Sequence, residues 1–224
     1  SEILHEFNRH GARFPSYNSI IAGGDNACIL HYTENDQPLK DGDLVLIDAG
    51  CEFAMYAGDI TRTFPVNGKF TQPQREIYEL VLKAQKRAIE LLVPGNSIKL
   101  ANDEVIRIKT QGLVDLGILK GDLDKLIEEK AYRQFYMHGL GHWLGLDVHD
   151  VGRYDDDRSR TLEVGMIITV EPGIYISEEA DVPAQYKGIG VRIEDNLLMT
   201  EYGNKNLTAA APKEIDDIEN LMKN

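Results

Sequence analysis

The stretch Leu39-Lys-Asp-Gly-Asp-Leu-Val-Leu-Ile-Asp48-Ala-Gly50 decides the fold, because a second copy of it follows later in the chain. It aligns without gaps with Leu162-Glu-Val-Gly-Met-Ile-Ile-Thr-Val-Glu171-Pro-Gly173. The leucine, both glycines, the apolar run and an acidic residue before the last two positions all correspond. Short apolar runs bounded by turn residues predict β-strands, so each copy is predicted to be a turn followed by a strand that ends in an acid.

Each copy is followed by a second predicted strand with another acidic residue, Asp59 in the first half and Glu194 in the second. One acid at a strand end is ordinary turn chemistry, and one matching segment can arise from shared turn-strand patterns. Matching acids after both copies favour an internally duplicated fold. Its halves would face one another across a pseudo-twofold axis, and the four acids would meet at the centre.

Helices are predicted between the two copies. Apolar periodicity predicts them over about residues 71–93, 98–116 and 123–130, the first with a capping-box pair, Thr71 and Gln74, and Pro73 in its first turn. Residues 1–66 are predicted to form loops and strands, and residues 166–170 and 190–199 are each predicted to form a strand. No Pro-, Gly- or Ser-rich linker divides the chain, so we predict one α+β domain over residues 1–224.

The bulk composition excludes several classes of protein. The chain has 24 Lys plus Arg against 37 Asp plus Glu, a formal charge of −13 that disfavours binding to nucleic acid. Its apolar runs are far too short to cross a membrane. Only Cys28 and Cys51 are present, too few for a disulfide framework, so a reducing cytoplasm is the expected location.

A histidine cluster lies just before the second copy. In His138-Gly-Leu-Gly-His142-Trp-Leu-Gly-Leu-Asp-Val-His149-Asp150, three of the six histidines occur within a short glycine-rich segment. A single histidine here would more often be an ordinary core residue, but three among glycines indicate a shaped pocket. The segment does not have the His-Glu-x-x-His spacing of helical zinc sites, and the chain has no Gly-x-Ser-x-Gly or Walker motif.

A set of two Asp, two Glu and one His is dominated by oxygen and suits hard or borderline ions. Mn²⁺ is expected first, with Co²⁺, Zn²⁺ or Fe²⁺ as alternatives. One ion would need only two or three of these side chains, whereas a bridged pair would use all five. Two such ions can hold and activate a bridging water, which allows hydrolysis without a Ser or Cys nucleophile.

These residues resemble a known family across essentially the whole chain. The chain is similar to the C-terminal catalytic domain of the aminopeptidase P branch of the pita-bread metallopeptidases, which also include prolidase and methionine aminopeptidase. The strongest segments of the resemblance are residues 28–35, 46–50, 58–64, 138–150, 169–173 and 190–195. The resemblance implies a strongly curved antiparallel sheet backed by helices, in agreement with the internal duplication.

The resemblance also assigns roles to residues of this chain. Two divalent metal ions would be held by five side chains: Asp48, Asp59, His142, Glu171 and Glu194. Of these, Asp59 and Glu194 would bind both ions. Glu171 would also move the proton of the bridging water. Three histidines would line the pocket and bind substrate or stabilise the transition state: His31, His138 and His149. Arg192, beside the last ligand, would orient carboxylates or bind substrate.

The resemblance predicts removal of an N-terminal residue from peptides with proline at the second position. Full-length members carry an N-terminal domain, missing here, that supports homo-oligomer formation and helps to close the active site. The isolated domain is therefore expected to bind metal, and its inactivity in isolation is one alternative.

Other functions remain open at this point. Prolidase, an Xaa-Pro dipeptidase, uses the same five ligands, and the segments from His5 to His31 and from His142 to His149 favour aminopeptidase P over it. Methionine aminopeptidase resembles the chain mainly at the ligands. A creatinase-type enzyme or a non-catalytic binding module would lack some of the five ligands, all of which are present here.

Overall fold

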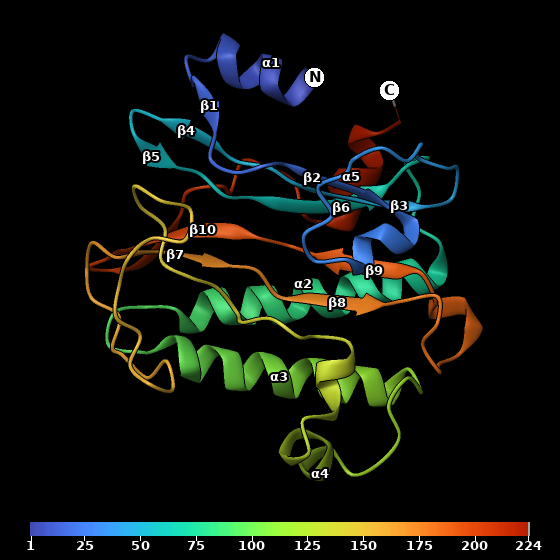
Figure 1. Ribbon diagram of the computed structural model, residues 1–224. Coiled ribbons are helices and arrows are strands. Elements are labelled where there is room, and N and C mark those ends of the chain that lie inside the picture. Colours follow the sequence, from blue (N-terminus) through green and yellow to red (C-terminus); the bar gives the residue numbers. More distant parts are fainter. Residues whose placement is uncertain (224) are drawn as a thin grey trace.

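The computed structural model describes residues 1–223 and combines helices with short sheets in which the paired strands are antiparallel (Figure 1). The helices are α1 (Glu2–Arg9), α2 (Gln72–Leu91), α3 (Ile98–Asp115), α4 (Leu123–Glu128) and α5 (Ile215–Leu221), with 3-10 turns η1 (Gly24–Cys28), η2 (Ala131–Gln134) and η3 (Ala184–Tyr186). The strands are β1 (Phe14–Pro15), β2 (Ile20–Gly23), β3 (Leu44–Asp48), β4 (Cys51–Phe53), β5 (Tyr56–Ala57), β6 (Thr61–Pro65), β7 (Ile167–Val170), β8 (Gly173–Ile176), β9 (Ile189–Arg192), β10 (Asp195–Thr200) and β11 (Gly203–Asn206).

The strands form four short sheets on one side of the long helices. Their orders are β1-β4-β5, β2-β3-β6, β11-β10-β7 and β8-β9. In Figure 1 the helices α2 and α3 run side by side below the strands, with α2 adjacent to β7, β8 and β9. This arrangement leaves the strand ends that carry acids free to form a site on the other side of the sheets from the helices.

The internal duplication is visible in the strand pairing. In the first half β3 pairs with β6, with Asp48 opposite Thr61, and in the second half β7 pairs with β10, with Val170 opposite Asp195. The strands of each copy therefore lie in equivalent places, and the acid that ends the run, Asp48 or Glu171, lies at the same end of both. This geometry agrees with the prediction of two duplicated halves.

The second acid of each half lies just before a strand rather than within one. Asp59 precedes β6, and Glu194 lies in the break between β9 and β10. The single strand predicted over 190–199 is therefore wrong in detail, because the chain changes partners there. The β9 part pairs with β8, whereas the β10 part pairs with β7 and β11.

Helix α2 is built as its sequence predicts. The capping box is present, with the Thr71 amide donating to Gln74 Oε1 at 2.9 Å. Gln74 Nε2 also donates to the carbonyl of Gly42 at 2.8 Å, which ties the helix start to the turn of the first copy. Ile77 and Val81 are fully buried against the sheets, and burying each contributes about 1.5–3 kcal/mol.

The two halves meet along β6 and β9, where side chains replace a regular ladder of backbone hydrogen bonds. Thr63 Oγ1 donates to the Arg192 carbonyl at 2.9 Å and accepts from the Arg192 amide at 3.2 Å. The Glu194 amide donates to the Thr61 carbonyl at 3.0 Å. This seam holds the acids of one half beside those of the other.

The first 66 residues hold one helix that the sequence did not predict. Helix α1 buries none of its residues, so no stripe of core residues marks it in the sequence. Glu2 in its first turn and Arg9 in its last turn interact favourably with the helix dipole, and Arg9 pairs with Glu6 at 3.1 Å. These interactions stabilise the helix. Across residues 1–223, each helix is too short or too polar to span a membrane.

Candidate active site

The acids at the strand ends come together although they are far apart in the sequence. Asp48, Asp59 and Glu194 expose only 8%, 5% and 2% of their surface. Burying several carboxylates in one place is costly unless cations balance their charges, so this arrangement favours a bound cation in addition to Arg192.

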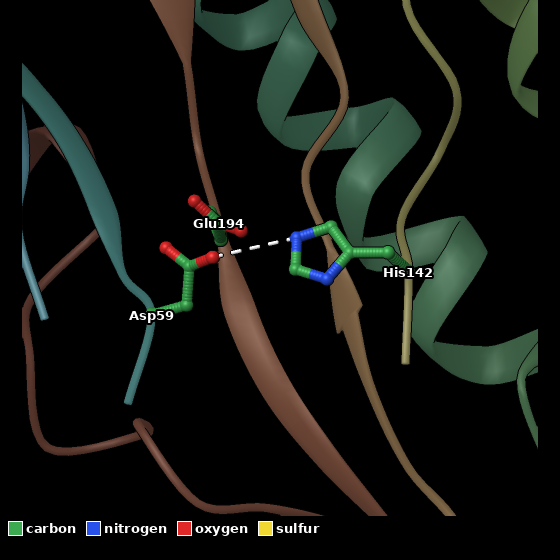
Figure 2. Close-up of side chains that lie close together, drawn as sticks. All are labelled: Asp59, His142 and Glu194. Carbon is green, nitrogen blue, oxygen red and sulfur yellow. Dashed lines mark ion pairs between the residues drawn. The ribbon is translucent and has the colours of Figure 1, made fainter. Parts of the chain in front are cut away.

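One triad of predicted ligands is close enough to hold a metal ion. Figure 2 shows the side chains of Asp59, His142 and Glu194 converging, and one ligand atom from each lies within 4.8 Å of the others. His142 Nε2 is 3.4 Å from Asp59 Oδ2 and 3.5 Å from Glu171 Oε1. The fourth acid of the predicted set therefore reaches the same histidine nitrogen.

Backbone contacts fix the orientation of His142. Its Nδ1 donates to the carbonyl of Trp143 at 3.0 Å, because that oxygen can only accept, and so Nε2 is the nitrogen that faces the acids. The neighbouring Gly141 lies against Thr169, and a Cβ there would overlap the Thr169 carbonyl oxygen. A glycine is thus required for the histidine segment to approach β7 this closely.

Asp48 is held by two partners from opposite parts of the chain. Arg192 donates to Asp48 Oδ2 at 2.7 Å, and the hydroxyl of Tyr17 donates to Asp48 Oδ1 at 2.5 Å. The same hydroxyl lies 2.7 Å from Asp59 Oδ1. Tyr17 therefore joins the two acids of the first half, and Arg192 joins Asp48 to the second half.

The protonation of the acids reflects their crowding. Burial raises the pKa of Glu171 to about 7, and the negative charges of Asp59 and Asp48 add to this against the cationic His142 and Arg192. Burial and the neighbouring acids also raise the pKa of Glu194 well above its usual value. Burial likewise raises the pKa of Asp48, although Arg192 opposes this. Crowding thus favours the protonated, neutral forms of these three acids, at a place where a divalent cation would neutralise their charges.

The charge on His142 responds to the same acids. Burial alone would lower its pKa, but the hydrogen bond to Asp59 and the charge of Glu171 outweigh burial and raise it. The acids therefore favour the protonated form of the imidazole, which lies between two carboxylates, where a metal ion would fit. The donor set of carboxylate oxygens and one imidazole nitrogen matches divalent ions of hard or borderline character.

The other three predicted histidines lie around this cluster at different depths. His138 is close to Glu171, with its Nδ1 3.7 Å from Glu171 Oε2, and its Nε2 lies 2.7 Å from the hydroxyl of Tyr175. The ring of His149 packs edge-on to that of His142 with centroids 4.4 Å apart. His149 and His31 are exposed at the mouth of the site.

All of these side chains line one cavity of about 580 Å³, a size suited to a small ligand. The nine residues predicted as ligands or pocket residues all contribute to its wall: His31, Asp48, Asp59, His138, His142, His149, Glu171, Arg192 and Glu194. The structure thus brings the whole predicted set together.

Three polar residues of the site were not predicted from the sequence. Tyr17 contacts two acids, and Thr61 Oγ1 donates to Glu194 Oε2 at 2.6 Å. The hydroxyl of Tyr175 accepts from Arg192 at 3.0 Å and contacts His138. Thr61 and Tyr175 lie close in the sequence to Asp59 and Glu171. No local pattern marks Tyr17, because it is 31 residues from Asp48.

Comparison with known proteins places this geometry in a family. Residues 1–201 match metallopeptidase family M24. The Xaa-Pro aminopeptidase of Haemophilus influenzae is 89% identical over 222 residues, which are 99% of this chain and 52% of that protein. The Xaa-Pro aminopeptidase of Escherichia coli is 65% identical over 221 residues, which are 99% of this chain and 50% of that protein. The chain thus spans about half the length of these relatives.

Solved structures give the same result for the fold. Aminopeptidase P from E. coli with the inhibitor Pro-Leu matches with a TM-score of 0.98 and 65% identity, covering 99% of this chain and 50% of that chain. Proline aminopeptidase P II from Yersinia pestis matches with a TM-score of 0.97 and 64% identity, covering 99% of this chain and 51% of that chain. The predicted α+β pita-bread fold and the resemblance to aminopeptidase P are confirmed.

Proposed function

Because the chain belongs to metallopeptidase family M24, we propose that it is the catalytic part of a two-metal aminopeptidase that removes an N-terminal residue preceding proline. The observation that carries this proposal is the convergence of four carboxylates and His142 in one cavity. The preference for proline rests on the relatives that are named Xaa-Pro aminopeptidases, two of which share 89% and 65% identity with this chain.

The proposed ligands are Asp48, Asp59, His142, Glu171 and Glu194. Divalent ions held there, in the proposal Mn²⁺, would supply a water of lowered pKa and would polarise the carbonyl of the peptide bond. Asp59 and Glu194 are proposed to bridge the ions, and their side chains lie within 4.8 Å of His142 in one triad.

Glu171 is proposed as the group that moves the proton. Its pKa of about 7, raised by burial, allows its carboxylate to take a proton and return it to the leaving amine near neutral pH. Its Oε1 lies 3.5 Å from His142 Nε2, which supports a place for Glu171 in the same cluster.

His138 is proposed to bind the substrate as a neutral group. Burial and the positive charges of Lys109 and Arg192 lower its pKa to about 3. A neutral imidazole adds no charge to the site, and the one N–H of His138 donates from Nδ1 to the Gly139 carbonyl at 2.8 Å, which fixes the ring where it would contact the substrate. His31 and His149, at the exposed mouth, are proposed to contact the substrate as it enters.

Hydrolysis assays test the substrate. The chain is loaded with Mn²⁺ and given an Xaa-Pro-Yaa tripeptide, an Xaa-Ala-Yaa tripeptide and an Xaa-Pro dipeptide. Release of the first residue from Xaa-Pro-Yaa alone is expected. Cleavage of the dipeptide instead would indicate prolidase, and metal binding without any cleavage would indicate that the rest of a longer protein is required. In Glu171→Ala we expect turnover to be lost, and near-normal turnover would contradict its role.

Elemental analysis after dialysis against Mn²⁺ tests the metal centre. About two equivalents per chain are expected if all five side chains act as ligands. The Asp59→Ala variant is expected to lose most of the bound metal. A cytoplasmic location, supported by the free thiols of Cys28 and Cys51, and homo-oligomer formation by the full-length protein remain predictions.

A further inference from the structure

A fully buried carboxylate lies directly behind the candidate metal centre. Asp195, the first residue of β10, follows Glu194, whose side chain faces the cavity. Because side chains alternate along an extended chain, that of Asp195 points the other way, toward the helices. Its two oxygens accept hydrogen bonds of 2.6–2.9 Å from five side chains: Arg62, Gln85, Asn206, Thr208 and Lys213.

Asp195 stays ionised in this setting. Burial alone would raise its pKa, but the charges of Arg62 and Lys213 outweigh burial and hold the pKa well below its usual range. A buried ion group of this kind contributes little net stability, since desolvation offsets the attraction, but it fixes the relative position of the segments that carry it. The segments fixed here are those that lead to the candidate metal ligands.

Arg62 connects Asp195 to both halves of the fold. One terminal nitrogen donates to Asp195 Oδ1 at 2.7 Å, and the other donates to the carbonyl of Glu194 at 2.6 Å and to that of Thr61 at 3.0 Å. Its Nε donates to the carbonyls of Ala211 and Pro212 at 3.3 and 3.1 Å. The guanidinium thus binds the backbone of Glu194. Arg62 itself belongs to β6, which begins just after Asp59.

Lys213 contacts the same carboxylate of Asp195 but does not bind the backbone of Glu194 or Thr61. Its ammonium donates to Asp195 Oδ2 at 2.6 Å and to Gln85 Oε1 at 2.9 Å. Neither partner is a candidate metal ligand or the backbone of one. Lys213 therefore supplies a matched comparison, a cation on Asp195 that lacks the contacts to Glu194 and Thr61.

We propose that Arg62, held in place by Asp195, is a positioning residue that sets the spacing of the two proposed bridging ligands, Asp59 and Glu194. The inference rests on the proposed metal centre. A planar guanidinium is needed because it can bind a carboxylate on one edge and two carbonyls on the other, which a lysine ammonium on a flexible stem cannot do.

The test measures the affinity of the metal-free chain for Mn²⁺ by calorimetric titration, with thermal unfolding of the same samples. In Arg62→Lys, which keeps the charge beside Asp195, we expect Mn²⁺ affinity to fall by roughly 10- to 100-fold. In Lys213→Met we expect the melting temperature to fall while Mn²⁺ affinity stays close to that of the unaltered chain.

Each result bears on the inference. Unaltered Mn²⁺ affinity in Arg62→Lys would overturn the inference. An equal loss of Mn²⁺ affinity in Lys213→Met would also overturn it, because Arg62 would then act only by stabilising the fold, as Lys213 does. Failure of the unaltered chain to bind metal would instead overturn the proposed metal centre, and this inference with it.

A measurement on the unaltered chain covers the case in which Arg62→Lys does not fold. The amides of Glu194 and Arg192 donate across the seam to Thr61 and Thr63, and their hydrogen exchange reports how firmly the halves are joined. If the spacing set by Arg62 is coupled to the ligands, Mn²⁺ should slow their exchange by about tenfold or more. Exchange that does not change on addition of Mn²⁺ would overturn the inference.

Discussion

Tyr17 shows how much of the site depends on one hydroxyl group. That group lies 2.5 Å from Asp48 and 2.7 Å from Asp59, so it holds two acids of one half together. Burial raises the pKa of Tyr17 well above its usual range, and the charges of both acids add to this. The hydroxyl therefore remains a donor at every physiological pH and orients the carboxylates that would bind metal.

The variant Tyr17→Phe removes this hydroxyl and keeps the ring. Asp48 and Asp59 would then lose a shared donor, so we expect Mn²⁺ affinity to fall by roughly 10- to 100-fold. The measurement is a titration of the metal-free variant with Mn²⁺. Tyr56→Phe, at an exposed position of β5, is the control and should bind Mn²⁺ as the unaltered chain does. Equal affinity in both variants would contradict the orienting role.

The raised pKa of Glu171 predicts that metal binding depends on pH. Burial raises this pKa to about 7, so below pH 7 the metal-free carboxyl holds a proton that an incoming ion must displace. Affinity for Mn²⁺ should therefore rise with pH through this range, by about tenfold per pH unit for each proton that the ion displaces from Glu171 and from Glu194 and His142, whose pKa values are also raised. Calorimetric titrations at several pH values, in buffers of different ionisation enthalpy, measure both quantities. Affinity independent of pH would show that Glu171 is already ionised.

At the scale of elements, the turn after β3 depends on a close approach between two backbone segments. A Cβ on Gly50 would overlap the carbonyl oxygen of Gly58, in the segment that leads to Asp59. Backbone cannot move aside as a flexible side chain can, so any larger residue must push the two segments apart. Gly58 itself has room, since a Cβ there would meet its nearest neighbour, the Cys51 carbonyl, at an ordinary 3.4 Å.

We therefore expect Gly50→Ala to lower the free energy of unfolding by about 1–3 kcal/mol and to weaken Mn²⁺ binding as Asp59 moves. Gly58→Ala, only eight residues away, should change both quantities far less. Denaturant unfolding and metal titration of the two variants provide the comparison. A harmless Gly50→Ala would mean that the segments can separate without disturbing Asp59.

At the scale of the whole molecule, metal binding should stabilise the fold. The candidate ligands come from both halves, so the unfolded chain cannot hold them together and an ion binds the native state selectively. At a free Mn²⁺ concentration of about 100 times Kd this linkage contributes about 2.7 kcal/mol. For a chain of this length that corresponds to a rise in Tm of roughly 5–10 °C.

Calorimetry with Mn²⁺ or with a chelator measures this shift, and Asp59→Ala serves as the control that should show none. A chain whose Tm is the same in chelator and in Mn²⁺ would contradict a metal centre that joins the halves. The shift tests the whole site at once, whereas Tyr17→Phe tests a single contact within it.

Much of the fold was predictable because its signals are local. The helices α2 and α3 follow apolar periodicity and a capping box, and the structure places them at Gln72–Leu91 and Ile98–Asp115, against predicted ranges of 71–93 and 98–116. Helix α1 was missed because it buries nothing, and the strand over 190–199 was predicted as one because a break between two sheets leaves no mark in the amino-acid pattern.

The sequence by itself determined the duplication, the acids that end its strands and the glycine-rich histidine segment, since each is a pattern of neighbouring residues. The tertiary structure alone decided which side chains support those acids. Tyr17 lies 31 residues from Asp48, and Arg62 lies 133 residues from Asp195. Contacts over such separations depend on how two halves pack and on which donors a buried carboxylate finds there, and no local pattern encodes that choice.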